Sequence, residues 1–148
     1  MKIINRFVGE FFFLSNFYPS TLSFHGLIYP TAEHAYQAHK SEDLEIRKFI
    51  SCAKNPMEAK KLGKCIPLKD DWGEKKVILM QEIIDEKFKN PILSEMLKAT
   101  GNSLLIHENK FNDKFWGICA GKGENWLGKT LEDTRKKIIE SEDLEFFG

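Results

Sequence analysis

The sequence is poor in cysteine, and its three thiols at Cys52, Cys65 and Cys119 are widely spaced. An odd number of cysteines without a C-x-x-C pair disfavours a disulfide framework and a structural zinc site, and it is typical of reduced thiols in a cytosol. His34 and His39 are spaced i, i+5, which on a helix places them on different faces, unlike the i, i+4 pair of a zinc-binding helix. We therefore expect a cytoplasmic protein with no metal and no other cofactor.

The sequence also lacks long hydrophobic runs and an excess of charge of either sign. No stretch approaches the roughly 20 apolar residues that a membrane-spanning helix needs, and the first residues do not resemble a signal peptide. The 22 basic and 22 acidic residues cancel to a formal net charge of +0. This balance argues against broad electrostatic binding to nucleic acid or membrane, although a local basic pocket is compatible with it. We expect no membrane partner, and the sequence does not indicate an oligomeric state.

Aromatic side chains, by contrast, are abundant: the chain has 12 Phe and 3 Trp among its 148 residues. Such side chains supply large buried areas and also stack on flat ligands. The length suits one folding unit, and we find no internal repeat, low-complexity tract or linker. The sequence therefore predicts a single domain over residues 1–148.

The order of local signals predicts an α+β fold that is predominantly helical. A small N-terminal β portion comes first, with a hairpin over residues 22–29 that turns at His25-Gly26. About six helices follow. In the preceding segment EFFFLSNFYPS, residues 10–20, we expect Phe11 and Phe13 to alternate into the core together with Phe7, as in a strand.

Capping residues predict where several helices begin and end. Thr31, Asn55 and Asn90 are typical N-caps, the two Asn being followed by Pro, and Gly63 and Gly101 are typical C-terminal stops.

Hydrophobic spacing predicts the remaining elements. Apolar residues at helical intervals predict a core helix over residues 72–88, and residues 103–107 read as a buried strand. The capping-box-like sequence at Thr130 predicts the start of the last helix, with Ile138 and Ile139 facing inward and a tail from residue 140 that frays.

Three groups of residues carry chemistry in their side chains. In the first, Glu33, Gln37 and Lys40 share one face of the helix after Thr31, so that both long charged side chains could reach one ligand. From spacing alone, a solvated helix face is the favoured explanation.

The second and third groups combine a Trp with charged or Gly-rich surroundings. Trp72 opens a helix beside charges and is either a core residue, which is favoured, or a platform for a flat base. Asp113 and Trp116 precede a Gly-rich loop at residues 121–128 whose N–H groups could cradle an anion, although an ordinary tight loop is commoner. This loop matches neither a dinucleotide fingerprint nor a P-loop.

Six blocks in fixed order resemble the YbiA-like family, also called NADAR. The blocks are FLSNFYPS at 13–20, GLIYPTAEHAYQAHK at 26–40, DWGEKK at 71–76, ATGN at 99–102, NDKFWG at 112–117 and GENWLG at 123–128. They span about residues 7–136, nearly the whole chain. The resemblance implies hydrolysis of the bond between ribose C1′ and a nitrogen, either in phosphorylated ribosylamino-pyrimidine intermediates of riboflavin synthesis or in ADP-ribosylated guanine.

The resemblance also implies roles for individual residues. Glu33, Trp72 and Asp113 fall on positions implicated in activity, and Lys40 matches the lysine proposed to attack the sugar. Glu33, Lys40 and Asp113 are thus the expected catalytic residues. The expected substrate-binding residues are Ser15, Asn16, Phe17, Tyr18, His34, Gln37, Trp72, Trp116, Gly117, Lys122, Gly123 and Asn125.

The expected chemistry is either covalent or direct. A desolvated Lys40 amine could form a Schiff base with the opened ribose while Glu33 moves protons, or Glu33 or Asp113 could activate water. Lys122 and the N–H groups around Gly123 would hold a phosphate. The expected substrate is a small phosphorylated riboside; the alternatives are an ADP-ribosyl-guanine hydrolase, for which nucleic acid serves only as the carrier of the modified base, and a non-catalytic ADP-ribose or nucleotide reader.

Overall fold

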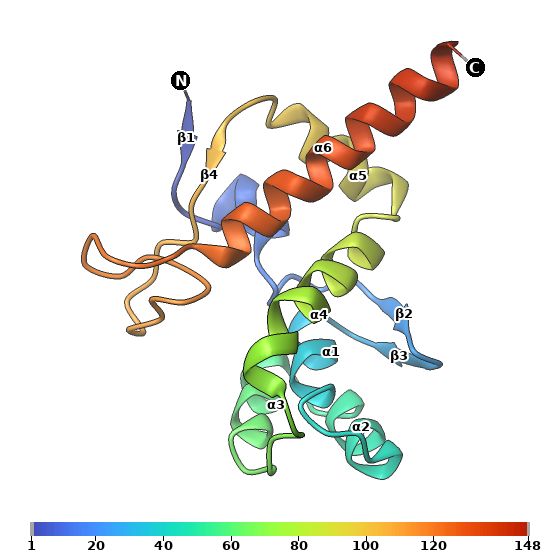
Figure 1. Ribbon diagram of the computed structural model, residues 1–148, viewed down its shortest axis with the longest axis vertical. Helices are drawn as coiled ribbons and strands as arrows, with labels where there is room; N and C mark the ends of the chain where they lie inside the picture. The colour runs from blue at the N-terminus through green and yellow to red at the C-terminus, as the bar shows by residue number, and fades with distance from the viewer. Residues whose placement is uncertain (1, 148) are drawn as a thin grey trace. The chain divides into compact units, whose positions relative to one another are not determined.

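The structure is a computed structural model that describes residues 2–147, and two compact units make up the chain (Figure 1). Unit 1 is Met1–Ser15 together with Phe88–Gly148, and unit 2 is the continuous segment Asn16–Lys87. Each unit has its own buried side chains. The single domain that the sequence predicts stays a prediction.

A short parallel strand pair joins the two segments of the chain that make up unit 1. Strand β1 (Ile3–Ile4) pairs with β4 (Leu104–Leu105), so that Ile3 faces Leu104 and Ile4 faces Leu105. The other elements of unit 1 are the 3₁₀-helix η1 (Gly9–Leu14), α5 (Pro91–Ala99) and α6 (Trp126–Phe147).

The core of unit 1 lies where η1, α5, β4 and α6 meet. Phe13 of η1 contacts Phe88 edge to face, with ring centroids 6.5 Å apart. Arg135 of α6 is buried and donates hydrogen bonds to Thr100 Oγ1 at 2.8 Å and to the Ser103 carbonyl at 2.9 Å. The long last helix is therefore fixed to the turn between α5 and β4 by a buried charged group that makes two hydrogen bonds there.

Unit 2 contains a β-hairpin and four helices. Strands β2 (Leu22–Phe24) and β3 (Leu27–Tyr29) pair antiparallel, and His25 and Gly26 turn with φ of 48° and 83° as the predicted two-residue hairpin requires. The helices are α1 (Ala32–Ala38), α2 (Leu44–Ser51), α3 (Pro56–Gly63) and α4 (Trp72–Lys87).

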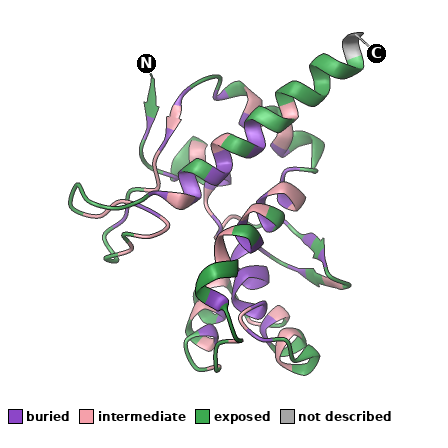
Figure 2. Cartoon of the chain, in the orientation of Figure 1, coloured by how far each residue is buried: buried purple, intermediate pink, exposed green. Residues whose placement is uncertain are grey.

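Helix α1 is the centre of unit 2. Helices α2, α3 and α4 all contact it, and every one of its residues is buried (Figure 2). A helix that is buried all round takes its stability from its neighbours rather than from its own seven residues. Side chains of α1 are therefore held in place from several sides.

The predicted fold class is confirmed, and so are the capping signals. Thr31, Asn55 and Asn90 each accept a hydrogen bond from a backbone N–H of the first turn of their helix. Helix α3 ends at Gly63, and Gly101 follows α5 with a φ of +64°. In the part of the chain that the structure describes, no helix is both long and apolar enough to cross a bilayer.

The predicted strand around Phe11 is wrong, because this segment is the 3₁₀-helix η1. Gly9 turns the chain with a φ of +59°, and Phe11 N–H then donates to the Val8 carbonyl at 3.0 Å. Phe7 and Phe13 are buried as expected, but Phe11 is only half-buried. The spacing of the aromatic residues fits a strand, and the glycine turn and the i→i+3 bonds override it.

The predicted start and inner face of the last helix are also wrong. Helix α6 begins at Trp126, and Thr130 lies inside it, its hydroxyl donating to the Trp126 carbonyl at 2.7 Å. The inward face carries Leu127 and Leu131, whereas Ile139 is 38% exposed. The tail that we expected to fray continues the helix to Phe147.

Candidate active site

Glu33 and Gln37 lie one turn apart on α1, inside unit 2. Their side chains are joined by a hydrogen bond of 2.8 Å from Gln37 Nε2 to Glu33 Oε1. Glu33 is 8% exposed and Gln37 is 3% exposed, so the solvated helix face that spacing alone favours is wrong. A carboxylate in such a position is held in one orientation and shielded from bulk water.

Lys40 lies in the turn after α1, directly following the C-cap residue His39, and its side chain is half-buried. Its Nζ is 5.6 Å from the centroid of the Tyr36 ring. Burial lowers the pKa of Lys40 below its usual 10.5, the nearby Glu33 carboxylate raises it in part, and the charges of Lys64, Lys60 and Lys76 lower it further. These surroundings increase the share of neutral amine, which is the nucleophilic form.

Tyr36 and Trp72 form an aromatic wall beside this amine. Their ring centroids are 5.3 Å apart at an angle of 50°, and they connect α1 to the first turn of α4. Trp72 is 7% exposed, which confirms the core-packing interpretation, and Lys69 Nζ lies 5.8 Å from its ring centroid. Stacking of a substrate base on Trp72 stays a prediction.

Asn16 supports the start of α1. Its backbone carbonyl accepts a hydrogen bond of 3.0 Å from the Glu33 N–H, and its buried side chain donates to Met80 Sδ at 3.5 Å. Asn16 thus lies in a turn that fixes the helix end carrying Glu33. Phe17 and Tyr18 follow half-buried, with Lys87 Nζ 5.9 Å from the Tyr18 ring, and Ser15 is the half-buried last residue of unit 1's N-terminal segment.

His34 is built into the packing of unit 2. One ring nitrogen lies 2.8 Å from Thr31 Oγ1 and the other lies 3.0 Å from the Ala53 carbonyl. Burial lowers the pKa of His34, so the neutral ring is favoured. With both nitrogens already bonded, His34 holds α1 against the segment after α2 and has no ring nitrogen left for the predicted substrate contact.

Gln37 also marks the closest approach of α1 and α3. A Cβ atom added at Gly63 would overlap the Gln37 side-chain oxygen Oε1. Only glycine permits this spacing, and the contact fixes α3 beside the Glu33–Gln37 pair.

Most predicted residues of unit 1 lie in the loop before α6. Asp113 Oδ1 accepts hydrogen bonds from the N–H groups of Phe115 at 3.1 Å and Trp116 at 2.9 Å. The Trp116 ring contacts Phe115 edge to face, with centroids 4.8 Å apart. Asp113 therefore shapes the loop that carries Trp116, whereas its expected catalytic role stays a prediction.

Asn125 and Gly117 hold the same loop together. Asn125 Oδ1 accepts from the His107 N–H at 2.9 Å, and Nδ2 donates to the Leu105 carbonyl at 2.9 Å. At Gly117, an added Cβ would overlap the His107 carbonyl. Both residues thus have structural reasons for their identity, apart from any contact with substrate.

Several backbone N–H groups of the predicted anion cradle around Gly123 already bond within the loop. The N–H groups of Lys122, Glu124 and Asn125 already donate to the carbonyls of Cys119, Lys114 and Gly117, and those of Trp126 and Leu127 donate to Phe115 and Trp116. Residues 119–122 form a tight turn with φ of 52° at Ala120 and 77° at Gly121. The loop's own carbonyls cap α6, so these five N–H groups are used within the protein. A phosphate contact at Lys122 or Gly123 stays a prediction.

The predicted site has further neighbours that its motifs did not indicate: Tyr36, Lys60, Lys64, Lys69 and Lys76. Only the i, i+4 spacing of Lys60 with Lys64, and of Trp72 with Lys76, could have indicated that each pair shares a helix face.

Among the described residues, neither a cavity nor a metal-binding cluster competes with the predicted site. A shallow cavity of about 360 Å³ in unit 1 is lined by residues between Ile3 and Phe11 and contains none of the predicted site residues. Among residues 2–147, no three His, Cys, Asp or Glu side chains are grouped so as to hold a metal ion.

The fold defines a mixed α+β protein. A buried carboxylate lies in the first turn of α1, and a partly desolvated lysine follows the end of this helix. The NADAR domain model matches residues 6–139, and the chain belongs to this family. The solution NMR structure of the Escherichia coli protein YbiA has a TM-score of 0.84 at 32% identity, covering 97% of this chain and 88% of that one.

Curated relatives are about a third identical to this chain over the residues that align. N-glycosidase YbiA of Escherichia coli (strain K12) is 34% identical over 134 residues, which are 88% of this chain and 81% of YbiA. A riboflavin biosynthesis protein of Vibrio vulnificus is 35% identical over 132 residues, and the chloroplastic riboflavin biosynthesis protein PYRR of Zea mays is 36% identical over 125 residues. The aligned part is only 36% of the Vibrio protein and 20% of the maize protein.

Proposed function

We propose that this protein is an N-glycosidase that hydrolyses the C1′–N bond of a phosphorylated ribosylamino-pyrimidine. The observation that carries the proposal is the half-buried Lys40 amine beside the buried Glu33 carboxylate, with burial and neighbouring cations lowering the pKa of the lysine. A protein that only reads ADP-ribose needs stacking and phosphate contacts but no activated amine. The names of the relatives support the glycosidase class and a riboflavin-related substrate.

In the proposed mechanism, Lys40 is the nucleophile and Glu33 moves the protons. The neutral Lys40 amine attacks C1′ of the ring-opened ribose, and the bond from C1′ to the pyrimidine amine breaks. Glu33 gives the departing nitrogen its proton, and the lysine loses one as the C=N bond forms. Water then adds to this imine, releasing ribose phosphate and restoring the amine, so the net reaction consumes one water.

Gln37 and Tyr36 assist by position. The hydrogen bond from Gln37 Nε2 to Glu33 Oε1 holds the carboxylate that moves the protons in one orientation. The Tyr36 ring lies beside the lysine and limits its access to water. Both effects keep the amine and the carboxylate in a fixed, poorly solvated arrangement.

The decisive experiment is reductive trapping. We expect borohydride, added during turnover of a ribosylamino-pyrimidine phosphate, to fix the sugar on the peptide that contains Lys40, as read by mass spectrometry. Lys40→Met should give no adduct and no released base, whereas Lys54→Met, at an exposed lysine outside the site, should behave as the wild type. Wild-type turnover by a Lys40→Met protein of unchanged circular dichroism would overturn the covalent mechanism.

The same assay separates the alternative functions. Release of guanine only from ADP-ribosylated guanine DNA would assign the protein to the other branch of the family. Binding of ADP-ribose without release of base from either substrate would identify a reader. A direct attack by water would leave turnover intact but give no trapped adduct at Lys40.

A further inference from the structure

The first turn of α6 carries a tryptophan and a lysine on one side of the helix, in unit 1. Trp126 begins the helix and Lys129 follows at i+3, so the two side chains are neighbours on its surface. The Lys129 Nζ lies 4.6 Å from the centroid of the Trp126 ring. Lys129 is exposed and Trp126 is half-buried, so the pair lies at the surface of the protein.

Contacts with the preceding loop hold the Trp126 ring in place. Its Nε1 donates to Glu124 Oε1 at 3.4 Å, and its centroid lies 6.3 Å from that of the Phe115 ring, with 31° between the two planes. The Trp126 N–H donates to the Phe115 carbonyl at 3.0 Å, which fixes the start of the helix to the loop. Trp116 in turn contacts the Phe115 ring edge to face. The indole is therefore a fixed flat surface, which is what stacking on a ligand requires.

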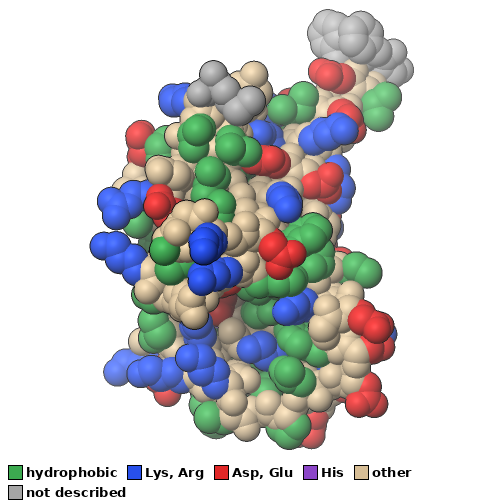
Figure 3. Space-filling view, turned by 60° about the vertical axis from the view of Figure 1, so that its left-hand side comes forward, with side chains coloured by type: hydrophobic (Ala, Val, Ile, Leu, Met, Phe, Trp, Pro, Cys, Tyr) green, Lys and Arg blue, Asp and Glu red, His purple; other side chains and the backbone are tan. Residues whose placement is uncertain are grey.

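The Lys129 ammonium is not neutralised by a carboxylate. Lys129 has no ion pair with any residue that the structure describes. Asp133, one turn further along α6, pairs with Lys137 at 3.3 Å instead, and Lys98 of the same unit binds Glu142 at 2.7 Å. Figure 3 brings forward the side on which the loop before α6 lies, and basic side chains reach the surface there. An exposed cation is held only weakly by an aromatic ring, so this ammonium can move to an anion.

A nucleotide has the two parts that this pair can bind. A flat base stacks on the face of an indole, and lysine binds phosphate as a point charge. The base would take the place of the ammonium above the Trp126 ring, and the long, flexible Lys129 side chain would turn to the phosphate. Both groups would thereby exchange a weak contact for a stronger one.

We propose that Trp126 and Lys129 form a binding site for a free nucleotide, with the base on the indole and the phosphate on the ammonium. Neither residue takes part in the proposed hydrolysis, so this inference goes beyond the proposed function and does not depend on it. The site is formed entirely by residues of unit 1.

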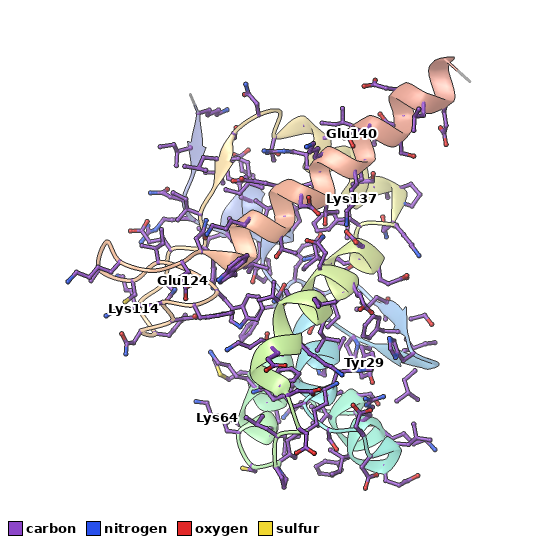
Figure 4. All side chains as sticks on the ribbon, in the orientation of Figure 1. Tyr29, Lys64, Lys114, Glu124, Lys137 and Glu140 are labelled. Carbon is purple, nitrogen blue, oxygen red and sulfur yellow. The ribbon has the colours of Figure 1, made fainter. Side chains whose placement is uncertain are left out.

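The surroundings of the ring favour a free nucleotide over a nucleic-acid strand. The carboxylate of Glu124, which Figure 4 labels, lies at the edge of the indole. A strand carries a phosphate on each side of every base, and one of the two would be repelled by this carboxylate. A mononucleotide has its phosphate at one end only and can turn it toward Lys129.

The test is equilibrium binding of AMP, adenosine and ribose 5-phosphate, measured by calorimetry. We expect AMP to bind at least about tenfold more tightly than either part alone, because stacking and the ion pair both contribute. Lys129→Gln should weaken the binding of AMP at least about fivefold and leave adenosine unchanged. Trp126→Leu should weaken AMP and adenosine at least about fivefold and leave ribose 5-phosphate unchanged. Lys136→Gln, at an exposed lysine on the same helix, is the matched control and should change none of the three.

Circular dichroism shows whether each variant is folded, and if Trp126→Leu is not, Lys129→Gln decides, because its side chain is exposed. Absence of binding to the wild type at millimolar AMP would overturn the site, as would equal binding of AMP by the wild type and a folded variant. A single-stranded ten-nucleotide DNA that binds far more tightly than AMP, and with a steep dependence on salt, would overturn the assignment to a free nucleotide. Because the assay measures binding without turnover, its result stands whether or not the protein cleaves a ribosylamino-pyrimidine phosphate.

Discussion

Lys87 shows how strongly one residue can tie stability to pH. Its side chain is 1% exposed, and burial lowers its pKa to about 7. In the unfolded chain the lysine titrates near its model-peptide value of about 10.4. Between these two values the unfolded chain binds the extra proton, so the free energy of unfolding rises as pH increases from about 7 to 10. Below pH 7 the penalty of the buried charge is fully present.

We therefore predict that Lys87→Met raises the free energy of unfolding at pH 6 by several kcal/mol, at about 1.4 kcal/mol per unit of pKa. The variant should also lose most of the rise in stability between pH 7 and pH 10. Urea unfolding at pH 6 and pH 9 measures both effects. A variant that is less stable than the wild type at both pH values would show that the ammonium group contributes more through its contacts than its burial removes.

Gly63 tests the close approach of α1 and α3. We predict that Gly63→Ala lowers the free energy of unfolding by about 1–3 kcal/mol, because the added methyl group overlaps the Gln37 side chain. Gly73→Ala, on α4 where no atom lies within 4 Å of an added Cβ, is the matched control. It should be neutral or more stable by up to about 1 kcal/mol. Equal effects of the two substitutions would contradict the contact.

At the scale of the element, the N-cap of α1 fixes the end of the helix that carries Glu33. Thr31 Oγ1 accepts from the His34 N–H at 3.1 Å and lies 2.8 Å from the His34 ring nitrogen. We predict that Thr31→Ala lowers the free energy of unfolding by about 1–2 kcal/mol and lowers kcat, since Glu33 lies in the first turn. Thr31→Ser keeps the oxygen and should restore both values; thermal unfolding and initial rates provide the measurements.

The Asp113 loop permits a similar separation of structure from charge. Asp113→Ala removes the acceptor of the Phe115 and Trp116 N–H groups and should lower the free energy of unfolding by about 1–2 kcal/mol. Asp113→Asn keeps an oxygen acceptor and should leave the unfolding midpoint nearly unchanged. A loss of activity in the stable Asn variant would then measure what the charge contributes, and full activity would confine Asp113 to shaping the loop.

These elements also show what could be predicted from the sequence. Caps at Thr31, Asn55 and Asn90 act over three residues, so their signals are local and the structure agrees with them. The start of α6 depends instead on carbonyls of Phe115 and Trp116, which reach the helix only after the loop folds. Local spacing therefore pointed to Thr130.

The candidate site was predictable in part for the same reason. The spacing of Glu33, Gln37 and Lys40 predicts a shared helix face, but it does not predict burial, which α2, α3 and α4 supply from elsewhere in the chain. His34 was expected to contact substrate. Its hydrogen bond to the Ala53 carbonyl joins residues that are far apart in the sequence, so local spacing could not predict it. The resemblance indicated the residues, and the fold shows which of them, such as His34, also have a structural reason for their identity.

At the scale of the whole molecule, the balance of 22 basic and 22 acidic residues sets what the protein binds without a specific site. We predict no binding of unmodified duplex DNA at micromolar protein and about 150 mM salt, because too few phosphates would be neutralised. Fluorescence anisotropy of a labelled duplex measures this directly. Micromolar binding with a steep dependence on salt would contradict it and would favour a nucleic-acid substrate.

The contact between Tyr18 and Lys87 has a consequence for chain topology. These residues lie close to the two ends of unit 2, Asn16–Lys87, and 5.9 Å separates the lysine Nζ from the tyrosine ring centroid. Unit 2 is thus an insertion whose entry and exit lie side by side, the arrangement that tolerates circular permutation and transplantation into a host protein. The segment that carries Glu33 and Lys40 could accordingly be excised, closed with a short linker and studied as a minimal cassette.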